Sequence, residues 1–132
     1  MMDWKECTGK NIAKSVKTDK NMISSLKGIA EVKIESADKL PDNLFYGKIT
    51  LLYDALREYL ECMALENGYK IYNHECYSSF LKEIMYLDTE AELFDELRKV
   101  RNSINYYGRK VSEDEAEHII SRLKMLIKQV SR

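Results

Sequence analysis

The chain has 132 residues, enough for one domain with a substantial core and too few for two domains of ordinary size. Hydrophobic residues make up 45% and charged residues 33%, with five glycines and one proline. This composition excludes a disordered chain, a collagen-like repeat and a turn-rich β-sandwich, and it predicts long helices. No apolar run approaches the roughly 18–20 residues of a membrane span, and the first residues do not resemble a signal peptide. We therefore expect a soluble, cytoplasmic protein.

The spacing of apolar residues predicts two long helices in the first half of the chain. The first is expected over 11–35, after an N-terminal segment (1–10) that we expect to be loosely ordered. Residues 36–43 contain the only proline and are predicted to form a loop. The second helix, 44–67, is apolar around so much of its circumference that it should be buried on more than one side. Gly68 is expected to end it.

Three further helices are predicted in the second half. Residues 69–73 should connect to a shorter helix over 74–87, followed by helices over 90–107 and 112–131, with Gly108 between them. Capping-box patterns mark the starts of the last two helices: Thr89 to Glu92 and Ser112 to Glu115. No stretch alternates as a β-strand does. The predicted fold is all-α, an up-and-down four-helix bundle with an additional short helix, in a single domain over 1–132.

The three cysteines, Cys7, Cys62 and Cys76, are odd in number and form no C-x-x-C pair. This pattern indicates free thiols in a reducing compartment rather than a disulfide framework. Cys62, His74 and Cys76 are a conceivable set of soft metal ligands, but a zinc site needs four ligands, or three and a water, at tighter spacings. We therefore expect no metal and no cofactor.

The net charge of −1 conceals an uneven distribution. Residues 37–97 carry 5 Lys/Arg against 13 Asp/Glu, whereas residues 98–132 carry 9 against 4. A basic C-terminal third can attract a phosphate backbone locally. It can equally meet the acidic part of a second copy in a dimer, and charge alone leaves both interpretations open.

The stretch Leu97 to Gly108 combines an apolar seam with polar and aromatic side chains that do not suit an ordinary surface helix. Asn102 and Asn105 compete for backbone hydrogen bonds and cost helix propensity. At 100° per residue, Arg98, Arg101 and Asn105 share one face of this helix, and Asn102 shares another with Tyr106.

Arg101 flanks the apolar seam, so its guanidinium group should emerge at the edge of a helix interface. There it could hold a phosphate through two donors at once. The alternative is a salt bridge to a carboxylate of the buried helix, Glu58 or Glu61.

The run Arg101-Asn102-Ser103-Ile104-Asn105-Tyr106 resembles the signature of the HEPN superfamily, which is an Arg, often followed by Asn, four intervening residues and a His. Its place at the end of the penultimate long helix also fits. Looser similarity covers a central aromatic, Leu/Ala-rich helix over 46–66 and a connector with Gly68, Lys70 and His74. The resemblance spans residues 10–131.

This resemblance implies a helical bundle that dimerises through the motif helices of two protomers. Many members are metal-independent endoribonucleases, often toxins paired with a minimal nucleotidyltransferase, and others are non-catalytic partners that bind nucleotides or RNA. By position, Arg101 would bind phosphate and Asn102 would orient it. Arg98, Asn105 and Lys70 are further candidates for contact with phosphate or nucleotide.

The chain departs from the family where the His should stand, because Tyr106 occupies that position. A tyrosine with a pKa near 10 is a poor base at neutral pH, although its ring can stack on a nucleobase. The sequence therefore favours a dimeric nucleotide- or RNA-binding module, in a toxin–antitoxin or defence-type system, over an endoribonuclease with Tyr106 in the catalytic place. A non-catalytic helical adaptor is the third interpretation, with Tyr106 packed at a dimer seam.

Overall fold

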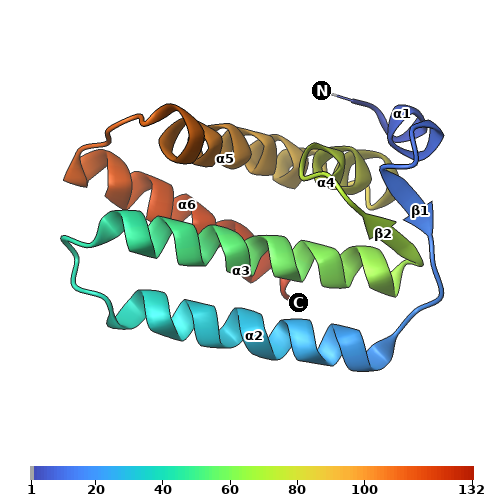
Figure 1. The fold of residues 1–132 in the computed structure, drawn as a ribbon, viewed down its shortest axis with the longest axis horizontal. Coiled ribbons are helices and arrows are strands. Elements are labelled where there is room, and N and C mark those ends of the chain that lie inside the picture. The colour runs from blue at the N-terminus through green and yellow to red at the C-terminus, as the bar shows by residue number, and fades with distance from the viewer. Residues whose placement is uncertain (1) are drawn as a thin grey trace.

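The computed structural model describes residues 2–132, which form a bundle of four long helices with short elements gathered at one end (Figure 1). The elements are, in chain order, α1 (Trp4–Gly9), β1 (Ala13–Ser15), α2 (Lys20–Lys39), α3 (Phe45–Glu66), β2 (Tyr69–Ile71), α4 (Glu75–Ser79), the π-helix η1 (Phe80–Ile84), α5 (Asp88–Tyr107) and α6 (Glu113–Val130). The long helices α2, α3, α5 and α6 alternate in direction (Figure 1). The predicted all-α, up-and-down bundle is confirmed.

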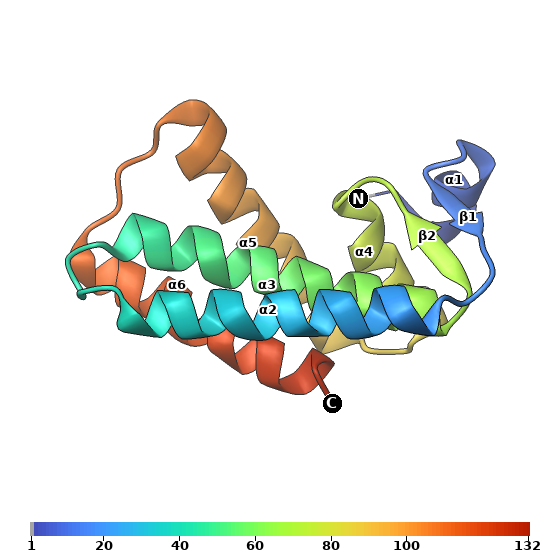
Figure 2. The same ribbon diagram turned by 60° about the horizontal axis from the view of Figure 1, so that its bottom comes forward.

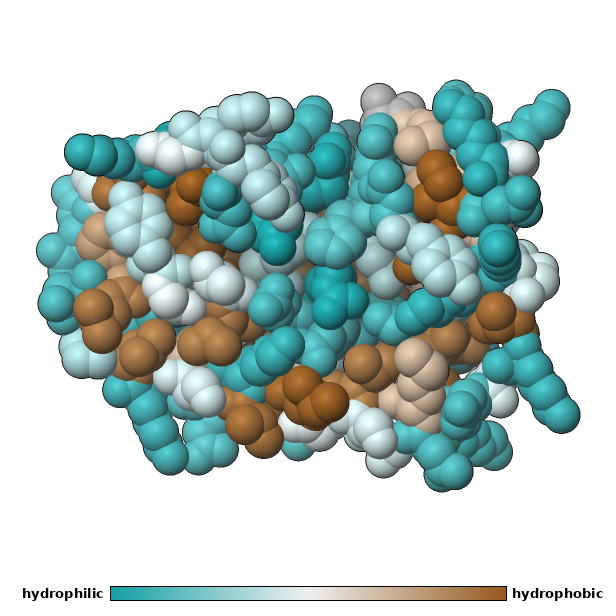
Figure 3. Space-filling model, viewed as in Figure 1, coloured by the Kyte–Doolittle hydropathy of each residue, from teal (hydrophilic) through white to brown (hydrophobic). Residues whose placement is uncertain are grey.

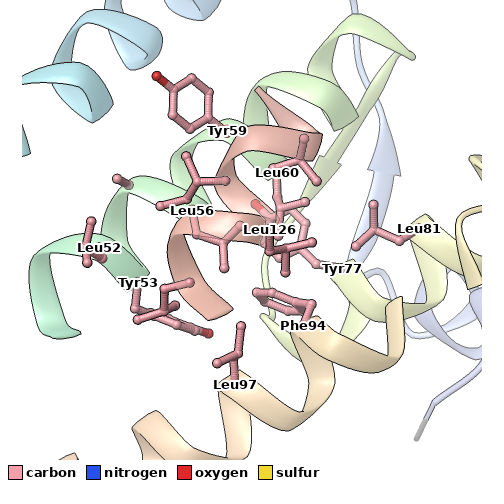
Figure 4. Close-up of a cluster of buried hydrophobic side chains, with 14 of the residues drawn as sticks. Leu52, Tyr53, Leu56, Tyr59, Leu60, Tyr77, Leu81, Phe94, Leu97 and Leu126 are labelled. Atoms are coloured by element: carbon pink, nitrogen blue, oxygen red, sulfur yellow. The ribbon is translucent and has the colours of Figure 1, made fainter. Parts of the chain in front are cut away.

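The helix α3 is the centre of the bundle, because α2, α6, β2 and α5 all pack against it. Leu52, Leu56 and Leu60 of this helix are almost completely buried. They meet side chains from α4, α5 and α6, among them Tyr77, Phe94 and Leu126 (Figure 4). The expectation that this helix is buried on more than one side is confirmed.

The predicted first helix begins too early. Helix α2 starts at Lys20, where the Asp19 side chain accepts a hydrogen bond from the Met22 amide at 3.1 Å. Upstream, Asn11 has a positive φ of 58°, which a helix interior does not tolerate. Ile12 and Val16 happen to share helical spacing, but their backbone groups bond to Tyr72 and Gly68.

A two-stranded antiparallel sheet was not predicted. Strands β1 and β2 pair Ala13 with Ile71 and Ser15 with Tyr69. Each strand has three residues, too few for a period-two pattern to be recognised. The sheet fixes the chain that precedes α2 to the end of α3. Strand β2 is followed directly by residues 72–74, which connect it to α4.

The helix predicted over 74–87 starts at Glu75 as α4 and continues directly into the π-helix η1, which ends at Ile84. Tyr86 takes a positive φ of 57°, and the Leu87 amide bonds back to the Leu81 carbonyl. Helix α5 consequently starts at Asp88, so Thr89 lies inside the helix and does not cap it. The other end signals are confirmed: Ser112 caps α6, and Gly108 ends α5 with a φ of 66°.

The N-terminal segment is the largest correction. Residues 4–9, expected to be loosely ordered, form α1, capped by Asp3, whose side chain accepts from the Glu6 amide at 2.8 Å. Cys7 is fully buried and is disulfide-bonded to Cys76 of α4, with the two Cα atoms 6.0 Å apart. The expectation of three free thiols is therefore wrong, because the fold brings together two cysteines that are 69 residues apart. Cys62 alone is free, and it is buried.

Apolar atoms occupy much of the lower half of the surface in Figure 3, where α2 and α3 lie. The large apolar side chains of α2 that stay exposed are Met22, Ile29 and Val32. Within residues 2–132, none of the helices combines the length and apolar character needed to cross a membrane.

The disulfide predicts a thiol count and a stability difference. We expect one free thiol in the denatured, unreduced protein and three after reduction. Because the bond closes a long loop, reduction should lower the free energy of unfolding by about 4 kcal/mol. Thiol titration and denaturant unfolding with and without reductant measure both effects.

The control is the Cys7→Ala/Cys76→Ala double variant, whose stability should not respond to reductant. Three free thiols in protein that has been exposed to a mild oxidant would contradict the pairing.

Candidate functional site

Arg101 stands where α5 leaves the bundle core. Phe94 and Leu97, on the preceding turns of α5, are buried against α3, and Arg101 follows one turn later on the same side. Beyond this point α5 diverges from α3, and the 108–112 segment returns the chain to α6 (Figure 2). The guanidinium group therefore lies at the edge of the α3–α5 contact, as the sequence predicted.

Two tyrosine rings flank the Arg101 guanidinium. Its Cζ atom lies 4.9 Å from the ring centroid of Tyr53 on α3 and 5.5 Å from that of Tyr106. These are cation–π distances. Its Nη1 group also donates to Asn102 Oδ1 at 3.4 Å and to the Tyr106 hydroxyl at 3.3 Å. The structure thus brings together three of the predicted residues, Arg101, Asn102 and Tyr106.

Within residues 2–132, no carboxylate forms a salt bridge with Arg101, and its Nε atom is buried without a hydrogen-bond partner. The two carboxylates considered from the sequence are paired elsewhere. Glu58 binds Lys33 at 2.8 Å, and Glu61 binds Arg57 at 3.3 Å and Lys70 at 2.6 Å. An Arg held between aromatic rings with no counter-charge is suited to bind an anion.

Two more arginines lie around this position, and each has an acidic partner. Arg98 binds Asp95 at 2.9 Å, one turn before Arg101 on α5. Arg57 lies one turn after Tyr53 on α3 and binds Glu61. Among the described arginines of this cluster, only Arg101 lacks a compensating carboxylate.

The remaining predicted residues are less closely joined to Arg101. The Asn105 side chain is exposed and makes no hydrogen bond in the described part of the chain. Lys70 belongs to β2 and forms a salt bridge with Glu61. The Lys70 Nζ atom also lies 6.0 Å from the Tyr72 ring centroid.

Tyr53 and His74 are the residues that the sequence analysis did not place in the site. Tyr53 is fully buried, and its hydroxyl lies 3.0 Å from His74 Nδ1. Burial raises the pKa of Tyr53, so the phenol keeps its proton. Burial, together with the charges of Arg57, Arg101 and Arg98, lowers the pKa of His74 to about 4, so its imidazole is neutral at pH 7.

A weak signal for these residues does exist in the sequence. Tyr53, Arg57 and Glu61 recur at four-residue spacing along the most apolar helix, which puts a line of polar groups on a buried face. His74 belongs to the connector that resembles the HEPN family, but the sequence did not place it beside Tyr53, because the β1–β2 pairing and the start of α4 set its position.

The metal-ligand trio is not assembled. Cys76 is bonded to Cys7, and Cys62 lies under α2, where its thiol donates to the Ile23 carbonyl. Burial raises the pKa of the Cys62 thiol to about 11, which disfavours a thiolate ligand. In the part of the chain that the structure describes, no group of three or more His, Cys, Asp or Glu side chains is arranged to hold a metal ion.

Comparison with known proteins identifies no relative: the chain matches no protein-family model, no curated protein and no solved structure.

The depressed pKa of His74 predicts a specific loss of stability in acid. The ordinary pKa near 6.5 applies in the unfolded chain, and the folded value is about 4, so the unfolded state binds the proton first. The contribution of the neutral ring to stability is complete above pH 6.5 and is lost as the pH falls towards 4. Allowing for partial solvent screening, we expect about 1–2 kcal/mol to be lost between pH 7.5 and 4.5.

Urea unfolding of the wild type and His74→Gln at both pH values tests this, because the carboxylates that titrate in the same range are common to both proteins. Equal pH dependence in the two proteins would contradict the assigned environment of His74.

Proposed function

We propose that this chain is a phosphate-binding module of the HEPN kind that recognises RNA or nucleotides through Arg101 and Asn102. The observation that carries the proposal is the uncompensated charge of Arg101, whose guanidinium is held between two tyrosine rings without a carboxylate partner in the described residues. The two-donor fork of an arginine matches the oxygen atoms of a phosphate. Arg57 and Arg98 lie nearby, but each is paired with a carboxylate, so the uncompensated charge is that of Arg101.

RNA is favoured over a free inorganic anion by the aromatic side chains at the end of α5. Tyr106 and Tyr107 are 67% and 84% exposed, and Tyr106 is also in contact with Arg101. An exposed ring beside a phosphate-binding Arg is the arrangement on which a nucleobase of a single strand stacks.

We propose binding without efficient cleavage. Tyr106 stands at the place of the motif His, and a phenol is a poor general base near neutral pH. The endoribonuclease alternative is tested by incubating labelled single-stranded RNA with the protein in EDTA, beside Arg101→Ala. Cleavage by the wild type alone would replace the binding proposal with the enzyme.

The resemblance to the HEPN superfamily extends the proposal to partners. The extended proposal includes a homodimer formed through the α5 motif helices and a minimal nucleotidyltransferase as partner. It also includes a cytoplasmic role in a toxin–antitoxin or defence-type system. Tyr107, which is 84% exposed and makes no contact with Arg101, supplies apolar area for a seam between two α5 helices. Because disulfides are rare in a reducing cytoplasm, the redox state of the Cys7–Cys76 pair in cells tests the location.

Removing the Arg101 side chain should weaken RNA binding. For Arg101→Ala we expect the affinity for single-stranded RNA to fall about tenfold or more, and the slope of log K against log salt to decrease by about 0.7, the value of one lost phosphate contact. Fluorescence anisotropy over a series of salt concentrations measures both quantities.

Arg122→Ala is the matched control, because it removes the same charge from α6, where Arg122 pairs with Glu96. Its effect on the affinity should be small. An Arg101→Ala protein that binds RNA as the wild type does would overturn the proposed function.

If Tyr106 stacks on a base, a substitution that keeps its ring and one that removes it should differ in RNA affinity. Tyr106→Phe keeps the ring and should bind RNA nearly as the wild type does. Tyr106→Ala should lose about 1–3 kcal/mol of binding free energy, the range of one base stacked on an aromatic ring. Equal affinities of the Phe and Ala variants would show that Tyr106 does not stack on a base.

A further inference from the structure

One buried side chain, Tyr53, connects two groups that lie far apart in the sequence. Its hydroxyl is 3.0 Å from Nδ1 of His74, in the segment between β2 and α4. Its ring face lies 4.9 Å from Cζ of Arg101, on α5. Since Tyr53 is fully buried on the central helix, it holds both groups in fixed positions relative to each other.

The His74 ring has one nitrogen in use and one free. Nδ1 faces the Tyr53 hydroxyl, whereas Nε2 makes no hydrogen bond with any described residue and is not among the enclosed polar atoms. The ring centroids of Tyr53 and Tyr77 lie 5.8 Å and 6.3 Å from that of the imidazole. The ring is therefore oriented by its neighbours, and its free nitrogen is available to a ligand.

The hydrogen bond with Tyr53 determines which nitrogen of the neutral His74 ring carries the proton. The Tyr53 phenol stays protonated and has no hydrogen-bond partner other than His74 in the described chain, so it donates to Nδ1. The remaining proton of the neutral imidazole is then on Nε2, which makes this atom a donor. A donor in the field of three arginines suits an anion and does not suit a cation or a metal ion.

We infer that His74 is a second phosphate-contacting residue of the Arg101 site, donating from Nε2, and that Tyr53 is the positioning residue for both. The ligand class is a phosphodiester strand, whose phosphate is held by groups from two separate segments of the fold. This inference rests on the proposed function and adds to it a residue that the motif does not contain.

The inferred contact makes binding dependent on pH. The charged groups around His74 are Arg57 and Asp54 on α3 and Arg98 and Arg101 on α5, and Tyr77 packs against it from α4. In the empty site the arginines repel the imidazolium form. A bound phosphate offsets their charge and favours that form, so RNA binding takes up a proton and should tighten as the pH falls.

The experiment measures binding of a short oligouridylate, about eight nucleotides long, with a dye that does not titrate near neutral pH. Uracil and phosphodiester groups also keep their charge between pH 7.5 and 5.5, so any change reports on the protein. For the wild type we expect the dissociation constant to fall about fourfold over this interval, the change that follows if bound RNA raises the pKa of His74 by about two units from its value of about 4. His74→Gln should bind more weakly and lose this pH dependence.

His118→Gln is the matched control, since His118 is the chain's other histidine and is exposed on α6. It should behave as the wild type. Arg101→Ala separates the two proposals. If it binds as the wild type does, the proposed function fails. If it loses binding while His74→Gln keeps both the affinity and the pH dependence, only the inference about His74 fails.

A second measurement needs no substitution at the site. The two histidines give two ring proton signals in an NMR titration, and His118→Gln assigns them. On addition of the oligouridylate, the signal of His74 should titrate at a higher pH, and Tyr53→Phe should reduce that shift while the protein stays folded. An unchanged titration of His74 in the presence of bound RNA would overturn the inference.

Discussion

The burial of α3 determines which charges in this protein are compensated. A charged group on a helix enclosed by other elements needs a partner, since leaving it unpaired would cost several kcal/mol. The two buried acidic residues of α3 are accordingly ion-paired, through Glu58–Lys33, Glu61–Arg57 and Glu61–Lys70. The more exposed Asp54 and Glu66 also pair, with Lys33 and Lys27. No carboxylate of the central helix is left for Arg101. Its free charge is therefore a consequence of how the rest of the core is satisfied.

The same enclosure explains the electrostatics of His74 and Tyr53. Tyr53 is fully buried and His74 is half-buried, so burial disfavours the charged form of each. The phenol stays protonated and the imidazole stays neutral, and they form one hydrogen bond between neutral partners. Arg101 lies against the other side of this pair with a charge that no described carboxylate balances.

The sequence predicted the long helices well because their signals are local. Gly68, Gly108 and the Ser112 cap each act within one turn, and the apolar seam of α3 repeats over many turns. It failed over 11–19, where two apolar residues with helical spacing, Ile12 and Val16, flank the strand β1. The strand conformation of β1 depends on pairing with β2, which lies more than 50 residues further along the chain.

The candidate site likewise has a part that the sequence could predict and a part that it could not. Arg101, Asn102 and Tyr106 lie within six residues on one helix, so their proximity follows from helical geometry. The Tyr53 ring and the His74 imidazole reach them from two other elements. Sequence spacing holds no information on such contacts, and Tyr53 resembled an ordinary core residue of α3. The Cys7–Cys76 bond was missed for the same reason.

The disulfide also makes one part of the chain a closed covalent ring and leaves the segments outside it linear. Residues 7–76 form a closed ring that contains α2 and α3, and α5 and α6 lie outside it. The exposed segment 41–44 between α2 and α3 is a site where a protease can cut inside the ring. The two pieces would then migrate as one species on a denaturing gel and separate only when a reductant is added. A nick at this position is invisible without that reductant.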